Sequence, residues 1–180
     1  MHRNAIAALA CALLLLVPLV TASCSGETEQ AAPAAPDTTA QVEPAAGQGY
    51  PSLDLAGYKA LVKESAGRIL LVCIWSVDCP ACQQELPVLE QIADRHDPDA
   101  LRVVYASLDR SDQTLASFFG DYEPIAEVVR VNDQVAAYTG TEYIPRLVIY
   151  DTEGKVSFID SGFYPEAMLE ALLNRAGLAE

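Results

Sequence analysis

Two cysteines three residues apart, Cys79 and Cys82, are the side chains of this sequence best suited to chemistry. They follow an apolar run, "RILLVCIW" (68–75), and precede a segment whose apolar residues recur at helical spacing. The first N–H groups of a helix and its dipole stabilise an anion, so the pKa of a thiol at such a junction falls. Cys79 is therefore the candidate nucleophile. Cys82 is one turn inward, where it should be less exposed and can close a disulfide with Cys79.

A metal site and a structural staple are the alternatives for this pair. A zinc site normally needs four ligands, and beside the two cysteines there is only the distant His96 and no second C-x-x-C. A disulfide across so short a loop would restrict the unfolded chain little. Redox exchange is the better interpretation, and we expect no metal and no cofactor beyond the disulfide.

The pair must be positioned by the elements on either side of it. The run 68–75 has no helical gaps, which is typical of a strand buried on both faces, and Pro80 suits the first turn of a helix. Residues 101–109 are predicted to form the next strand. Because a helix lies between the two strands, they should pair in parallel.

The rest of the domain predicts a mixed sheet covered by helices. The expected elements are helices over 54–66, 111–122 and 132–139, a short strand at 127–131, a hairpin over 146–160 and a final helix from Pro165. Parallel pairing first and an antiparallel hairpin last describe an α/β fold. Its central sheet should have four to five strands, with extra N-terminal elements.

The N-terminal part differs in composition from this domain. Residues 1–23 have Arg3 near the start, an apolar run and small residues before Cys24, the pattern of a secretory signal. The stretch "LVTASC" resembles a bacterial lipobox, so Cys24 is predicted to be lipidated; an ordinary cleaved signal and an uncleaved anchor are the alternatives. Residues 24–49, rich in Ala and Pro, are predicted to be a disordered tether. The folded domain should span 50–180.

The formal net charge of the chain is −14. Such a surface repels nucleic acid and anionic lipid headgroups. Nucleic acid is therefore not an expected partner. The charge could favour basic clients, although a solvated acidic surface explains it as well.

Taken together, these motifs resemble the thioredoxin superfamily. A strand ending at Trp75, then C-P-A-C opening a helix, matches the redox segment of that family, and "YIPRLVIYDTEGK" (143–155) resembles its cis-proline segment and hairpin. The signal, the tether and "CQQELP" (82–87) are most similar to exported TlpA-like and cytochrome-maturation thioredoxins. Those proteins have a glutamate three residues after the second cysteine, followed by x-Pro, and Glu85 and Pro87 match this pattern.

The resemblance implies a thioredoxin fold and a thiol–disulfide oxidoreductase with Cys79 and Cys82 as its redox pair. It also implies a role for Glu85, which, if buried, would have a raised pKa and exchange protons with the thiols; a solvated helix charge is the alternative. Cys79 would attack a client disulfide, and Cys82 would then resolve the mixed disulfide.

The resemblance also predicts the surface that meets clients. Ile144–Pro145 should be a cis peptide bond facing the cysteines, and the backbone of Ile144 could pair with an extended client. Pro80 should lie on the same surface. Trp75 would pack beside the disulfide and shape the client surface, with simple packing in the core as the alternative.

Three positions depart from the family pattern. Cys73 stands where thioredoxin has a buried aspartate, and is most simply a small core hydrophobe. Asp78 replaces the usual tryptophan before the first cysteine and should raise the pKa of Cys79. Arg146 follows the proline, where threonine is common. It could offset Asp78, contact clients or be solvated.

The expected activity is reduction of disulfides in exported proteins, with apocytochrome c as the client that the family suggests. A membrane electron donor of the DsbD or CcdA type would keep the protein reduced. The protein would be lipid-anchored in the bacterial cell envelope, facing the periplasm or the exterior. A disulfide oxidant is one alternative, and a thioredoxin-fold module that delivers copper or a partner protein is another. A peroxidase is less favoured, because no threonine precedes the reactive cysteine.

Overall fold

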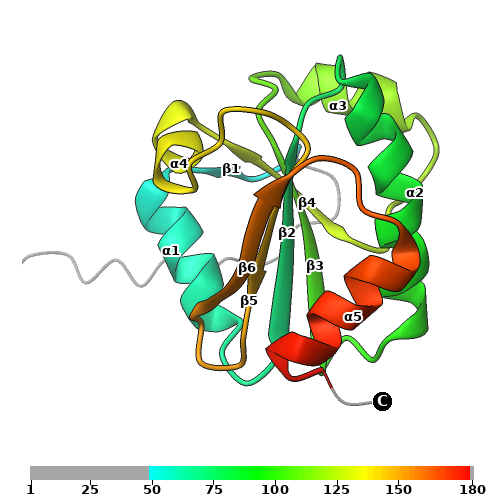
Figure 1. Cartoon of the computed structure of the whole chain (residues 1–180). Coiled ribbons are helices and arrows are strands. Elements are labelled where there is room, and N and C mark those ends of the chain that lie inside the picture. The colour runs from blue at the N-terminus through cyan, green and yellow to red at the C-terminus, as the bar shows by residue number, and fades with distance from the viewer. Residues whose placement is uncertain (1–48, 179–180) are drawn as a thin grey trace, which may run out of the picture. The chain divides into compact units, whose positions relative to one another are not determined.

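A computed structural model describes residues 49–178 as a six-stranded sheet with helices on both faces (Figure 1). The strands are β1 (Ser52–Leu53), β2 (Ile69–Trp75), β3 (Leu101–Ser107), β4 (Glu127–Val131), β5 (Arg146–Tyr150) and β6 (Val156–Ser161). The helices are α1 (Leu55–Glu64), α2 (Pro80–Arg95), α3 (Asp112–Phe119), α4 (Asp133–Tyr138) and α5 (Glu166–Ala176). The predicted signal, nearly all of the tether, and Cys24 lie outside the described residues.

The sheet has the order β1-β4-β3-β2-β5-β6, which puts β2 in its interior. Strand β2 pairs in parallel with β3 and antiparallel with β5, and all of its residues are buried. This explains its continuous apolar sequence, since neither face of the strand meets water. The predicted parallel crossover and the C-terminal antiparallel hairpin are both confirmed.

Two hydrophobic cores lie on the two faces of the sheet. Helices α2, α3 and α5 cover one face, where Leu89, Leu115 and Leu169 are fully buried. Helices α1 and α4 cover the other face through Tyr58 and Val135. Because successive side chains of a strand point to opposite faces, β2 contributes to both cores. The strand that leads to the cysteines is therefore fixed from both sides.

The number of strands was underestimated from the sequence, which predicted four to five. Strand β1 was missed because it has only two residues, too few to show a period-2 pattern. Its pairing partners, Arg130 and Val131, lie in β4, far along the chain. The mixed α/β fold and the extra N-terminal elements are as expected. Within residues 49–178, no helix is long and apolar enough to cross a membrane.

Candidate active site

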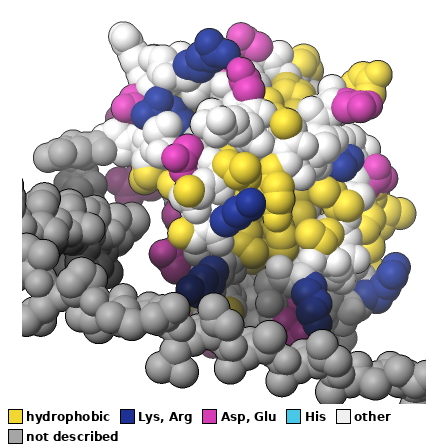
Figure 2. All heavy atoms as spheres, turned by 90° about the vertical axis from the view of Figure 1, so that its left-hand side faces the viewer, with side chains coloured by type: hydrophobic (Ala, Val, Ile, Leu, Met, Phe, Trp, Pro, Cys, Tyr) yellow, Lys and Arg dark blue, Asp and Glu magenta, His cyan; other side chains and the backbone are white. Residues whose placement is uncertain are grey.

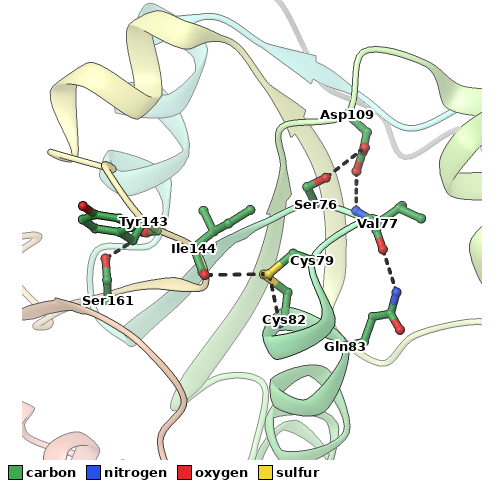
Figure 3. The surroundings of a disulfide bond; sticks show 9 residues. All are labelled: Ser76, Val77, Cys79, Cys82, Gln83, Asp109, Tyr143, Ile144 and Ser161. Atoms are coloured by element: carbon green, nitrogen blue, oxygen red, sulfur yellow. Dashed lines mark hydrogen bonds between the residues drawn. A yellow bond between two sulfur atoms is a disulfide. The ribbon is translucent and has the colours of Figure 1, made fainter.

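Cys79 and Cys82 are joined by a disulfide at the start of α2 (Figure 3). Cys79 is the N-cap residue in extended conformation, and Pro80 is exposed at the first helical position. The backbone N–H of Cys82 donates to Sγ of Cys79 at 3.2 Å. In the reduced protein this donor and the helix dipole would stabilise a thiolate on Cys79. Cys79 is half-buried whereas Cys82 is fully buried, so a client can reach only the first cysteine.

Asp109, at the end of β3, holds the loop that leads from β2 to Cys79 (Figure 3). Its carboxylate accepts hydrogen bonds from the backbone N–H of Val77 at 2.9 Å and from the hydroxyl of Ser76 at 3.2 Å. On the other side of the loop, the side-chain amide of Gln83 donates to the carbonyl of Val77 at 2.7 Å. Sequence reasoning missed Asp109. The one feature of the sequence that could have indicated this role is the position of Asp109 just after a predicted strand that pairs with β2.

The Ile144–Pro145 peptide bond is cis, as predicted. The carbonyl oxygen of Ile144 lies 3.7 Å from Sγ of Cys79 (Figure 3). Pro145 is buried and Ile144 is half-buried, so the backbone of this segment borders the redox pair. An extended client that paired with it would bring its own sulfur close to Cys79.

Arg146 fixes the segment that carries the cis bond. Its guanidinium donates to the carbonyl of Thr139 at 3.2 Å and to the hydroxyl of Ser161 at 3.3 Å. Ser161 in turn donates to the carbonyl of Tyr143 at 2.9 Å. These hydrogen bonds join the loop before the cis bond to β6, a role that was not among the three expected for Arg146. Asp78 is exposed and takes no part in this framework.

Glu85 is fully buried, on the turn of α2 after Cys82. One carboxylate oxygen, Oε2, accepts a hydrogen bond from the backbone N–H of Tyr164 at 2.9 Å, and Oε1 has no partner among the described residues. Burial raises the pKa of Glu85 to about 6, although the Tyr164 amide opposes the rise. A carboxyl that titrates near neutral pH can give and take protons in the reaction, which is the property proposed for it. Its catalytic role remains a prediction.

Trp75 is not on the client surface, so that part of the prediction is wrong. The indole is fully buried, and its ring centroid lies 5.2 Å from that of Phe118 and 5.9 Å from that of Phe119. The reason is that α3 covers the end of β2, which the local sequence does not reveal.

Cys73 is also fully buried. Its burial and, to a smaller extent, the negative charge of Glu85 raise the pKa of its thiol. It therefore stays protonated in the core.

The helix that carries the redox pair also borders a pocket. An apolar pocket of about 440 Å³ lies beside α2, lined by residues that include Leu86, Pro87 and Phe118. Glu90 also lines it, and its carboxylate accepts hydrogen bonds from the hydroxyls of Tyr105 at 2.6 Å and Tyr122 at 2.7 Å. Within residues 49–178, no group of three or more His, Cys, Asp or Glu side chains is arranged to hold a metal ion.

Comparison with known proteins gives a consistent result. Residues 67–156, half of the chain, match the thioredoxin-like family. The chain is 24% identical over 123 residues to the thioredoxin-like protein YneN of Bacillus subtilis, covering 67% of this chain and 72% of that protein. It is 22% identical over 125 residues to the thiol-disulfide oxidoreductase ResA of Bacillus thuringiensis, covering 68% and 71%.

Solved structures share the fold at low sequence identity. A thiol-disulfide isomerase from Corynebacterium glutamicum superposes with a TM-score of 0.59 at 17% identity, covering 66% of this chain and 86% of that one. A pneumococcal exposed lipoprotein thioredoxin from Streptococcus pneumoniae gives a TM-score of 0.50 at 20% identity, covering 63% and 88%. At these identities the likeness establishes the fold.

Proposed function

The chain belongs to the thioredoxin-like family and is a thiol–disulfide oxidoreductase, and from this premise we propose that it reduces disulfides of exported proteins in the cell envelope. The observation that carries the proposal is the geometry at Cys79. Its half-buried sulfur lies at a helix N-terminus, 3.2 Å from the N–H of Cys82 and 3.7 Å from the carbonyl of Ile144. The sulfur of the proposed nucleophile, Cys79, therefore lies next to both the backbone of the resolving residue, Cys82, and the backbone that is proposed to pair with a client.

The reaction consists of two exchange steps. The thiolate of reduced Cys79 attacks one sulfur of the client disulfide, so the client S–S bond breaks and a mixed disulfide forms. The departing client thiolate takes up a proton. Cys82, as a thiolate, then attacks Sγ of Cys79 and releases the second client thiol. Two electrons have passed to the client, and the Cys79–Cys82 disulfide remains to be reduced by a dithiol donor.

Glu85 serves the second step in this proposal. Cys82 is fully buried and needs a nearby base before it can attack, since only the thiolate is nucleophilic. Glu85 lies three residues along the same helix and is buried as well, and within residues 49–178 one of its carboxylate oxygens has no hydrogen-bond partner. A carboxyl with a pKa of about 6 accepts a proton at neutral pH and returns it when the pair is reduced.

We propose that the domain is held at a membrane through a lipid on Cys24. The signal-like residues 1–23, the lipobox-like end of that segment and the Ala/Pro-rich residues 24–49 support this. The donor would then be a membrane protein of the DsbD or CcdA type. Apocytochrome c is the proposed client, supported by the match of Glu85 and Pro87 to the cytochrome-maturation pattern. An unmodified Cys24 thiol in the mass spectrum of the native protein would refute the anchor.

The direction of electron flow is tested by the reduction potential of the Cys79–Cys82 pair. The protein is equilibrated in thiol–disulfide buffers of defined potential, and the fraction of reduced protein is measured by alkylation of its free thiols. A value near about −270 mV, as in thioredoxin, supports a reductant. A value near about −120 mV means that the protein inserts disulfides, and the proposed direction is then wrong.

A further inference from the structure

All three lysines of this acidic chain lie on one face of the domain. Lys59 and Lys63 come from α1 and Lys155 from the turn before β6, and all three line a pocket of about 540 Å³. Figure 2 looks onto the side of α1 and α4 and shows apolar side chains gathered there with basic side chains among them. Tyr138, which also lines the pocket, is half exposed, and Nζ of Lys59 lies 4.9 Å from the centre of its ring.

The positive charge of this pocket is only partly compensated. Lys155 pairs with Glu153, but among the described residues neither Lys59 nor Lys63 forms an ion pair. The two are four residues apart on one helix, where like charges repel each other. Both ammonium groups line the same pocket, so their positive charges add there. An anionic ligand would relieve the repulsion.

Strand β6 forms the other side of this surface and is the last strand of the sheet. Within residues 49–178, no strand pairs with its outer edge. A bulge lets Val156 pair with Tyr150 and Ile159 pair with Val148, so both apolar residues face the α1 side of the sheet. These two residues are 51% and 39% exposed.

These features point to one occupant, an extended peptide. The pocket is concave, whereas a bilayer presents a broad and nearly flat surface that does not match it. A free phosphate would meet the last turn of α1, where Lys63 lies and where the helix dipole is negative. A peptide strand added to β6 would instead place alternate side chains over Val156 and Ile159 and could reach the lysines with its carboxylates.

We propose that this α1–β6 surface binds an acidic, apolar segment of a partner protein, which adds to the edge of β6. The site is separate from the redox pair. It lies beside Tyr150, which pairs with Leu70 at the start of β2, whereas the cysteines follow the end of that strand at Trp75. At about 3.3 Å per residue, the strand between them spans roughly 17 Å. A partner bound here leaves Cys79 free to react.

The test uses the full chain and a fluorescein-labelled peptide in which glutamate alternates with valine. A peptide with glutamine in place of glutamate is the neutral control. Anisotropy should show binding of the acidic peptide that weakens with added salt, and weaker binding of the neutral one. Lys63→Glu should weaken the acidic peptide about tenfold, since it turns an attraction into a repulsion.

Two variants separate this site from general charge effects. Arg175→Glu makes the same charge change on α5, which covers the opposite face, and should leave peptide binding within about twofold. Replacing Val156 and Ile159 together by serine should weaken binding without changing its salt dependence. All variants should reduce insulin disulfides at the wild-type rate, so failure of this inference is distinguishable from failure of the proposed function.

Four results would overturn the proposal. These are equal weakening by Arg175→Glu and Lys63→Glu, and absence of peptide binding at low salt. The third is binding of vesicles with anionic phospholipid, lost in Lys63→Glu, when the peptide does not bind. The fourth is a concentration-dependent dimer in sedimentation that Lys63→Glu abolishes, which would make a second copy the occupant.

Discussion

Replacing Glu85 by glutamine should remove a pH dependence of stability that the buried carboxyl creates. Burial raises the pKa of Glu85 from its ordinary value of 4.5 to about 6. Since one pKa unit corresponds to about 1.4 kcal/mol, the difference between the folded and unfolded states is about 2 kcal/mol.

The sign follows from where the proton is held. Between pH 4.5 and 6 the folded protein keeps a proton on Glu85 that the unfolded chain has released. The contribution to stability is therefore complete below pH 4.5 and is lost as the pH rises through 6. Glutamine is neutral at every pH. The wild-type protein should thus lose about 2 kcal/mol relative to Glu85→Gln between pH 4 and pH 8.

Urea unfolding of the oxidised proteins at several pH values measures this difference. Glu142→Gln, at an exposed position on the loop before the cis bond, is the matched control and should follow the wild-type curve. Parallel curves for the wild type and Glu85→Gln would refute the argument that Glu85 titrates as a buried group. In the same variant, the rate at which Cys82 resolves a mixed disulfide should also lose its dependence on pH near 6.

Three other substitutions test the site. Cys82→Ser should accumulate a mixed disulfide between Cys79 and a client, seen on non-reducing gels; a variant that never does so contradicts the order of attack. Asp109→Ala should cost about 3 kcal/mol in urea unfolding and slow thiol exchange, because the backbone and hydroxyl donors of the loop before Cys79 lose a charged acceptor. If neither the free energy of unfolding nor the rate of thiol exchange changed, the loop before Cys79 would keep its conformation without Asp109. Trp75→Ala should cost about 3–5 kcal/mol, as expected for a buried aromatic. A cost below about 1 kcal/mol would contradict the tight packing of Trp75 on which this expectation rests.

The redox pair could be predicted because its geometry is local. Residues three apart on a helix face the same side, and a proline at the first helical position marks where the helix begins. The order of exposure of Cys79 and Cys82 follows from that helix and is confirmed. The cis bond at Ile144–Pro145 came instead from the resemblance, and the structure confirms it as well.

The environment of these residues could not be predicted, because it is built by segments far along the chain. The hydrogen bond to Glu85 comes from Tyr164, 79 residues later, and the loop before Cys79 is held by Asp109. The burial of Trp75 depends on the two phenylalanines of α3. In each case the side chain alone permits both a surface and a core role, and packing decides between them.

The same division holds for the whole molecule. The sequence by itself determined the buried strand, the helix that starts at Cys79 and the spacing of the two thiols, since these depend on backbone periodicity and side-chain polarity over a few residues. Only the tertiary structure decided the pKa of Glu85, the hidden position of Trp75 and the convergence of lysines from α1 and the β5–β6 turn. Burial and electrostatic fields arise from residues brought together by folding, and no local pattern records which ones will meet.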